Sequence, residues 1–330
     1  MFGAVEAGRI PGFEYQRLAL GEASYHVALG GEGPAVVLLH GYPETHYCWR
    51  GVAPALAASH TVIAPHLRGY GQTRAPRDGP DGAGYAKREM AADIVGILDS
   101  LGLERAAVVG HDRGGRVAYR MALDHPDRVE RLAVLNIVPT VEQFERVSPE
   151  NGLEYWPWFF LAQPPPFPEK LITAATAHYV GSVIEAWADR PEAIGADAIE
   201  HYVASFHEDA IAATCADYRA SFHLDRRHDA ADRSAGRRIE CPVLVLWGEL
   251  DRGLTSADEA SEGPPESALD VWRRWADRVE GRPIAAGHFI PEEAPDELTA
   301  ALEPFLQPGD ESAGSSESFM QVQRRAEEDA

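Results

Sequence analysis

Residues 106–116 read AAVVGHDRGGR. The first four form an apolar run typical of a short buried strand, and residues 117–123 carry a helical pattern. A strand, then Gly-x-Asp-x-Gly, then a helix is a nucleophile elbow, with Asp112 where most such turns hold serine. Glycines let the backbone turn sharply, and the start of a helix favours negative charge. We therefore predict that Asp112 is a nucleophile; the plainer alternative is a helix N-cap.

An aspartate at this turn restricts the chemistry. A carboxylate that attacks a saturated carbon forms an ester, which water can hydrolyse, whereas a serine would leave an ether that water could not split. The residue type thus indicates displacement at carbon, with a halide or an epoxide oxygen as the leaving group.

Two other segments carry groups that ester hydrolysis needs. The sequence HGYP at 40–43 follows a strand and can present the backbone N–H of Tyr42 to an oxyanion, together with the N–H of Arg113. An ordinary turn would look the same. His288 follows the last predicted strand, where the order nucleophile, acid, histidine places the general base, although a lone histidine is more often structural.

The acid that orients His288 has two candidates. Asp251 follows the predicted strand at 243–247, and Asn136 lies near the end of the strand at 132–137. An amide can accept a hydrogen bond from imidazole but cannot offset the charge of an imidazolium. We therefore predict Asp251, the alternative being that it is a solvent-facing turn residue.

Short strands and helices alternate along most of the chain. We predict two antiparallel strands within 14–29, strands at 35–39, 61–65, 106–109, 132–137, 243–247 and ending near 286, and helices at 85–101, 272–279 and 298–306. This alternation predicts an α/β fold, with a mostly parallel twisted sheet and helices on both faces.

The predicted sheet is interrupted by one long insertion. Residues 140–233 become aromatic and helical and include the prolines at 164–168, so we predict a helical cap there. The core then divides into a first part, 1–139, and a second part, 234–307. Residues 308–330 are rich in Gly, Ser, Glu and Asp, and we predict a disordered acidic tail.

The charge, the apolar runs and the cysteines of the sequence disfavour several classes of protein. The chain has 30 basic and 52 acidic residues, a net charge of −22, which disfavours nucleic acid and anionic membranes as partners. It lacks a run of about 18 apolar residues and a signal-like start, so we expect a cytoplasmic protein. Three widely spaced cysteines fit neither a disulfide framework nor a zinc site, and we expect no metal or cofactor. The acidity is consistent with adaptation to high salt or with coding bias.

Several blocks together resemble the haloacetate dehalogenases of the α/β-hydrolase fold, which include the fluoroacetate dehalogenases. The blocks are HGYPETHYCWR (40–50), HLRGYGQT (66–73), GHDRGGRVAYRMALDHP (110–126), LNIVPT (135–140), WFFLAQPPPFPE (158–169), DYRAS (217–221), LDVWRRWA (269–276) and GHFIPEEAP (287–295). The first and third blocks would also fit epoxide hydrolases.

The resemblance implies a two-step hydrolysis of a small anionic substrate. Asp112 would displace halide from a 2-haloacid, and His288 would activate water to cleave the ester. Two arginines that bind the substrate carboxylate in the family match Arg113 and Arg116, in agreement with the forked geometry of guanidinium; a lid-facing salt bridge and a surface position are the plainer alternatives. The resemblance also suggests a homodimer.

The halide site of the family is matched only in part. Trp158 and Tyr218 match two of its halide donors, but Pro157 stands in place of the histidine that supplies another. Asn136 replaces the family's aspartate, and His66 replaces the aspartate that usually opens the LRGYG segment. Because fluoride depends most on hydrogen-bond donors, we expect chloro- and bromoacids to be better substrates than fluoroacids.

Two other functions fit parts of the pattern. An epoxide hydrolase of the same fold would use two cap tyrosines as proton donors, and Tyr155, Tyr179, Tyr202 and Tyr218 are available. A non-catalytic carboxylate-binding protein could keep the fold and the arginine pair without turnover.

Overall fold

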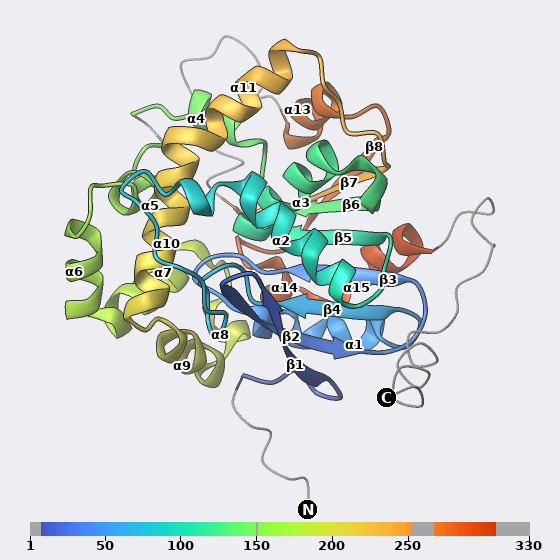
Figure 1. The fold of residues 1–330 in the computed structure, drawn as a ribbon, viewed down its shortest axis with the longest axis horizontal. Helices are drawn as coiled ribbons and strands as arrows, with labels where there is room; N and C mark the ends of the chain where they lie inside the picture. The colour runs from blue at the N-terminus through green and yellow to red at the C-terminus, as the bar shows by residue number, and fades with distance from the viewer. Residues whose placement is uncertain (1–7, 150, 252–266, 308–330) are drawn as a thin grey trace, which may run out of the picture.

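The computed structural model describes residues 8–149, 151–251 and 267–307. They form an eight-stranded sheet in the order β1-β2-β4-β3-β5-β6-β7-β8 (Figure 1). The strands are β1 Glu14–Leu20, β2 Ala23–Gly30, β3 Ala35–Leu39, β4 Thr61–Pro65, β5 Ala106–His111, β6 Val129–Leu135, β7 Val243–Gly248 and β8 Val279–Ile284. The β1–β2 and β2–β4 pairs are antiparallel and the others are parallel, which confirms the predicted fold class.

Helices cover both faces of the sheet. The core helices are α1 Ala53–Leu56, α2 Lys87–Ser100, α3 Asp112–Asp124, α13 Ala268–Trp275, α14 Ile290–Glu293 and α15 Pro295–Leu306. Helices α2, α3 and α13 lie on one face, and α1 and α15 lie on the other (Figure 1). The central strands β3, β4 and β5 are almost entirely buried because both faces are covered, which explains their continuous apolar sequences, whereas the edge strand β8 is largely exposed.

A run of helices separates β6 from β7 and gathers beside one end of the sheet (Figure 1). It comprises α4 Thr140–Glu145, α5 Trp156–Leu161, α6 Phe167–Ala174, α7 Thr176–Trp187, α8 Pro191–Ile194, α9 Ala196–Ser205, α10 Glu208–Ala220 and α11 Arg226–Ser234. None of the described helices is long and apolar enough to cross a membrane. The predicted tail at 308–330 lies outside the described residues.

The helix predicted at 272–279 was placed too far along the chain. Helix α13 starts at Ala268, where the Ser267 side chain accepts from the N–H of Asp270, and ends at Trp275. Val279 instead begins β8 and pairs with Val243. The apolar spacing of Trp272, Trp275 and Val279 resembles a helix, but strand pairing at the sheet edge decides the structure.

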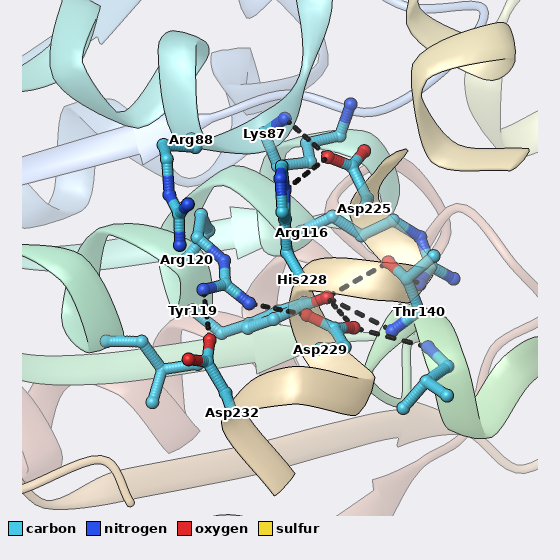
Figure 2. A network of polar contacts seen from close by, with 12 residues as sticks. Lys87, Arg88, Arg116, Tyr119, Arg120, Thr140, Asp225, His228, Asp229 and Asp232 are labelled. Atoms are coloured by element: carbon cyan, nitrogen blue, oxygen red, sulfur yellow. Dashed lines mark hydrogen bonds and ion pairs between the residues drawn. The ribbon is translucent and has the colours of Figure 1, made fainter. Parts of the chain in front are cut away.

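Helix α11, the last helix of the insertion, is joined to α3 by buried ion pairs (Figure 2). Arg120 pairs with Asp229 and with Asp232, each at 2.5 Å. Asp229 also accepts hydrogen bonds from the Tyr119 hydroxyl at 2.7 Å and from the N–H of Val141 at 3.2 Å. These contacts fix the orientation of α3, the helix that carries Asp112 at its first position.

The turn between β5 and α3 depends on glycine. A Cβ at Gly110 would lie 2.5 Å from the Gly114 carbonyl oxygen, and one at Gly114 would lie 2.5 Å from that of His40. Both neighbours are backbone atoms of packed elements, so they cannot move aside as a flexible side chain would.

We predict that Gly114→Ala lowers the free energy of unfolding by about 3 kcal/mol or more, because the new methyl group overlaps the backbone at the end of β3. Urea unfolding followed by circular dichroism measures this. Gly181→Ala, in α7, is the control, since a Cβ added there would meet no atom within 4 Å. It should leave stability unchanged or raise it by up to about 1 kcal/mol. Equal losses in the two variants would contradict the steric argument.

Candidate active site

Asp112 occupies a strained position at the end of β5. Its φ is +44°, in the left-handed region that few residues other than glycine adopt. The side chain is buried, and Oδ2 accepts a hydrogen bond from the N–H of Tyr42 at 3.1 Å. Burial alone would raise the pKa of the carboxyl, but His288 and Arg113 outweigh it and hold the pKa below its usual value. The Asp112 carboxylate is therefore ionised at neutral pH.

The structure brings His288 and Asp251 together. His288 Nδ1 lies 2.9 Å from Asp251 Oδ2, and both groups line the same cavity as Asp112. With its hydrogen on Nδ1, neutral His288 presents the Nε2 lone pair, and Nε2 has no hydrogen-bond partner in the described part of the chain. Burial lowers the pKa of His288, but Asp251 and Asp112 more than offset this and raise it to about 9.

Asn136 contacts the backbone of the histidine loop and not the imidazole. Its Nδ2 donates to the carbonyl oxygens of Gly287 at 3.1 Å and His288 at 2.5 Å, and its Oδ1 accepts from the N–H of Gly248 at 2.6 Å. The residue has a φ of +54°. Between the two candidates for orienting the base, the geometry therefore favours Asp251.

A buried pair beneath His288 was missed in the sequence. His111 Nε2 lies 2.8 Å from the carbonyl oxygen of His288, and His111 Nδ1 lies 3.0 Å from Glu44 Oε2. The carbonyl of His288 can only accept, so Nε2 is the donor in the first of these contacts. The position of His111 beside the nucleophile was its only signal, because Glu44 lies 67 residues away.

Arg113 forms an ion pair with Asp217, a carboxylate of the insertion. Its Nε and Nη2 donate to Asp217 at 3.0 and 2.6 Å, and Lys87 also contacts Asp217. Although burial acts in the opposite direction, Arg113 and Lys87 hold the pKa of Asp217 far below its usual range. The guanidinium of Arg113 lies 4.1 Å from the ring centroid of Tyr218. Only Nη1 lacks a hydrogen-bond partner within the described residues.

Arg116 has a different environment. It is buried, and no carboxylate of the described residues pairs with it. Its Nη1 donates to the Val138 carbonyl at 3.0 Å and to Thr140 at 3.3 Å, and Nη2 donates to Gln143 at 3.4 Å. Arg116 lines the cavity, whereas Arg113 does not. Of the two predicted carboxylate ligands, the structure places Arg116 at the cavity wall.

The cavity has a volume of about 370 Å³. Its lining residues are Asp112, Arg116, Asn136, Gln143, Glu154, Tyr155, Trp158, Glu185, Ala186, Trp187, Ala188, Asp189, Leu250, Asp251 and His288. The core supplies the reacting groups, and the insertion supplies the wall that faces them. This arrangement matches the concave pockets in which proteins bind small molecules.

The predicted halide donors meet at one side of the site. Trp158 lies on α5 and Tyr218 on α10, with their ring centroids 5.5 Å apart. The Tyr218 hydroxyl is buried and has no partner among the described residues. Pro157 lies in the first turn of α5 and supplies no side-chain donor. Tyr179 and Tyr202 are engaged elsewhere, with Tyr42 and Glu292 respectively.

His66 accepts a backbone hydrogen bond within the turn that it opens. Its Nδ1 accepts the N–H of Gln72 at 2.8 Å, a hydrogen bond that a carboxylate could also accept. The ring stacks on His46 with centroids 4.0 Å apart. Burial and the neighbouring histidines keep the pKa of His66 well below its usual value, so the ring is neutral and suited to stacking.

Comparison with known proteins supports the same assignment of fold. Residues 34–295 match the family model described as the alpha/beta hydrolase fold. The chain belongs to the α/β hydrolase family.

Its relatives include proteins of two activities. The chain is 39% identical to a fluoroacetate dehalogenase from Burkholderia sp over 89% of this chain and 94% of that protein. It is 31% identical to a soluble epoxide hydrolase from Corynebacterium sp. (strain C12), over 86% and 93%. The solved α/β hydrolase ALR0039 from Nostoc sp PCC 7120 superposes with a TM-score of 0.85 at 41% identity, covering 91% and 100%. This α/β hydrolase is thus related to dehalogenases and to epoxide hydrolases.

We predict that Asp251→Asn lowers kcat by about 10²–10⁴-fold, because an amide cannot stabilise the imidazolium that forms when His288 takes a proton from water. The pH profile should change as well. His288 acts as a base only when neutral, so activity rises with pH through its pKa, and losing Asp251 moves that rise to lower pH. Rates measured between about pH 5 and 10 test this. An unchanged midpoint would show that Asp251 does not act on His288.

We predict that Asn136→Asp fails to improve catalysis and destabilises the fold by about 1–3 kcal/mol. A carboxylate there would replace the Nδ2 donor and face the carbonyl oxygens of Gly287 and His288. Thermal unfolding and kcat of the variant provide the measurement. A gain in kcat would mean that position 136, and not Asp251, is the better site for the acid.

Proposed function

We propose that this α/β hydrolase is a hydrolytic dehalogenase of short 2-haloacids, acting through an aspartyl ester. In the first step an Asp112 oxygen attacks the carbon that bears the halogen, a C–O bond forms, and halide leaves with the electron pair of the carbon–halogen bond. In the second step His288 takes a proton from water, the hydroxide attacks the Asp112 ester carbonyl, and the 2-hydroxyacid is released.

One observation carries the choice of an anionic substrate, the state of Arg116. A buried guanidinium without a carboxylate partner is costly, and this one lines the cavity that holds Asp112. Arg120, on the same helix, is paired with two aspartates. A substrate carboxylate would supply the missing negative charge, and its position would direct the adjacent carbon toward Asp112.

The two steps place different demands on the base. In the free enzyme the charge of Asp112 contributes to the raised pKa of His288. Esterification removes that charge, so the pKa of His288 falls when the ester forms. Ester formation therefore favours the neutral form of His288 at the stage at which it acts as a base.

The ester carbonyl has a ready hydrogen-bond donor. The N–H of Tyr42 already bonds Asp112 Oδ2 at 3.1 Å, and the same N–H would meet the oxyanion that develops on that oxygen during hydrolysis. The N–H of Arg113, at the second position of α3, is the proposed second donor.

Chloride and bromide fit the leaving-group side better than fluoride. Trp158 and Tyr218 are the candidate donors, and Pro157 offers none. A departing fluoride carries the most concentrated charge and depends most on hydrogen bonds, so we propose that C–F cleavage is the weakest activity.

An epoxide hydrolase is the second candidate, on one specific observation. Tyr155 lines the cavity, and Tyr218, whose buried hydroxyl has no partner among the described residues, packs against the cavity residue Trp158, so these two tyrosines are the candidate proton donors. This function leaves the unpaired charge of Arg116 without a role, and it is therefore ranked second.

Halide release from chloroacetate, bromoacetate and fluoroacetate, in a buffer of non-halide salts, tests the proposal. We expect chloride and bromide release, little fluoride, and loss of all three in Asp112→Asn. Arg116→Gln should lower kcat/KM for the haloacids by roughly 30-fold or more, since it removes one partner of a buried charge pair. It should affect neutral chloroacetamide far less.

Arg88→Gln is the matched control. Arg88 pairs with Asp124, the last residue of α3, and does not line the cavity. Its kinetics should equal those of the unmodified protein. Faster turnover of styrene oxide than of any haloacid would reverse the ranking of the two functions. Binding of a haloacid without release of halide would identify a non-catalytic homologue.

A further inference from the structure

Glu293 makes four hydrogen bonds to backbone N–H groups of two separate segments. Its Oε2 accepts from Gly287 at 3.0 Å, from Asp189 at 2.9 Å and from Arg190 at 3.0 Å. Its Oε1 accepts from Phe289 at 2.9 Å. The side chain comes from the end of α14, and the residue is only 4% exposed.

The Glu293 carboxylate has no cationic partner within the described residues. The four backbone N–H groups stabilise it in place of a cation. Three of the N–H groups converge on Oε2 and one bonds Oε1, so both oxygens of the carboxylate are engaged. Bonds from N–H to a charged acceptor are stronger than those between neutral groups. A buried charge held in this way fixes the positions of every donor, since losing any of them would leave part of the charge unsolvated.

The two segments that Glu293 joins have different tasks. Residues 287–289 carry His288, and residues 187–189 form part of the cavity wall. They also touch each other directly. The N–H of His288 donates to the Trp187 carbonyl at 3.1 Å, and the two rings pack edge to face with centroids 5.0 Å apart.

The close approach of these segments depends on Gly287. A Cβ at this position would lie 3.0 Å from Glu293 Oε1 and would collide with the backbone N of Asp189. The glycine before the base is thus needed for the wall segment to reach the same carboxylate.

We propose that Glu293 is a positioning residue that fastens the loop of the general base to the wall of the cavity, so that His288 is aimed at the ester. The proposal rests on the proposed function in one respect, that His288 serves the second step. Ester formation needs only Asp112 and a leaving halide, whereas hydrolysis needs a well-oriented base. Loosening this loop should therefore slow hydrolysis far more than ester formation.

Glu293→Gln tests the assignment with little change in volume. The amide offers one acceptor oxygen and turns an NH₂ group toward at least one backbone N–H. With bromoacetate we expect the rate of the first halide release to stay within about threefold, while turnover falls roughly 10- to 100-fold. The ester should then accumulate, and mass spectrometry of the intact protein should show the adduct on Asp112.

Glu292→Gln is the matched control, one residue earlier and equally buried. The side chain of Glu292 contacts Arg50 and Tyr202, whereas only its backbone N–H bonds the histidine loop, at the Phe289 carbonyl. Burial raises the pKa of Glu292 and Arg50 opposes that shift, so glutamine here changes a buried polar group that does not bond either segment held by Glu293. We expect no accumulation of ester in this variant. If Glu293→Gln does not fold, Glu293→Asp, which keeps the charge but shortens its reach, should show the same imbalance between the two steps.

A second readout needs no substrate. Amide hydrogen exchange should speed up in residues 187–190 and 287–289 together in Glu293→Gln, and in neither segment in Glu292→Gln. Faster exchange in one segment alone, or equal slowing of both chemical steps, would overturn the proposal. If the unmodified protein releases no halide, the proposed function fails, and the exchange result still decides whether Glu293 fastens the two segments.

Discussion

The site depends on a steric constraint, the close crossing of the β5–α3 turn over the end of β3. Gly110 and Gly114 allow backbone atoms to approach where any Cβ would overlap a carbonyl group. Because the turn is so tight, Asp112 has a φ of +44°, and its carboxylate projects away from the sheet toward the N–H of Tyr42. The strain is tolerated because packed elements hold both sides of the turn, including the ion pairs between α3 and α11 (Figure 2).

Around that turn, several buried charged groups of the described residues have a specific partner. Asp217 neutralises Arg113, Asp251 faces His288, and Glu44 faces His111. Glu293 is satisfied by backbone N–H groups. Arg116 lies in the cavity wall and has no direct ion pair in the described part of the chain, although the charge of Asp112 acts on it. A ligand carboxylate would supply a direct partner for Arg116, so under the proposed function the charge balance of the buried groups would also favour an anionic substrate.

The fold and the elements that carry chemistry could be predicted because their signals are local. The elbow at Asp112 is recognisable within residues 106–116, and His288 follows a strand near the end of the core. The contacts that tune these groups could not be predicted in this way, because they join distant segments. Asp217 is 104 residues from Arg113, and Asp189 is 104 residues from Glu293. Polar residues at such separations carry no periodic pattern, and only the packing of the insertion on the core brings them together.

The position of the acid illustrates how the sheet permits an alternative arrangement. Strands β6, β7 and β8 are neighbours in parallel, so the residues that follow them meet at one edge. A carboxylate after β6 or after β7 can therefore approach a histidine that follows β8. In this chain Asp251, after β7, contacts Nδ1 of His288, and position 136 is released from that task. An amide there can donate and accept at once, and Asn136 uses both abilities to join the ends of all three strands. An aspartate could accept but not donate, so the relocated acid and the asparagine are complementary: each residue supplies the hydrogen bonds that its own position requires.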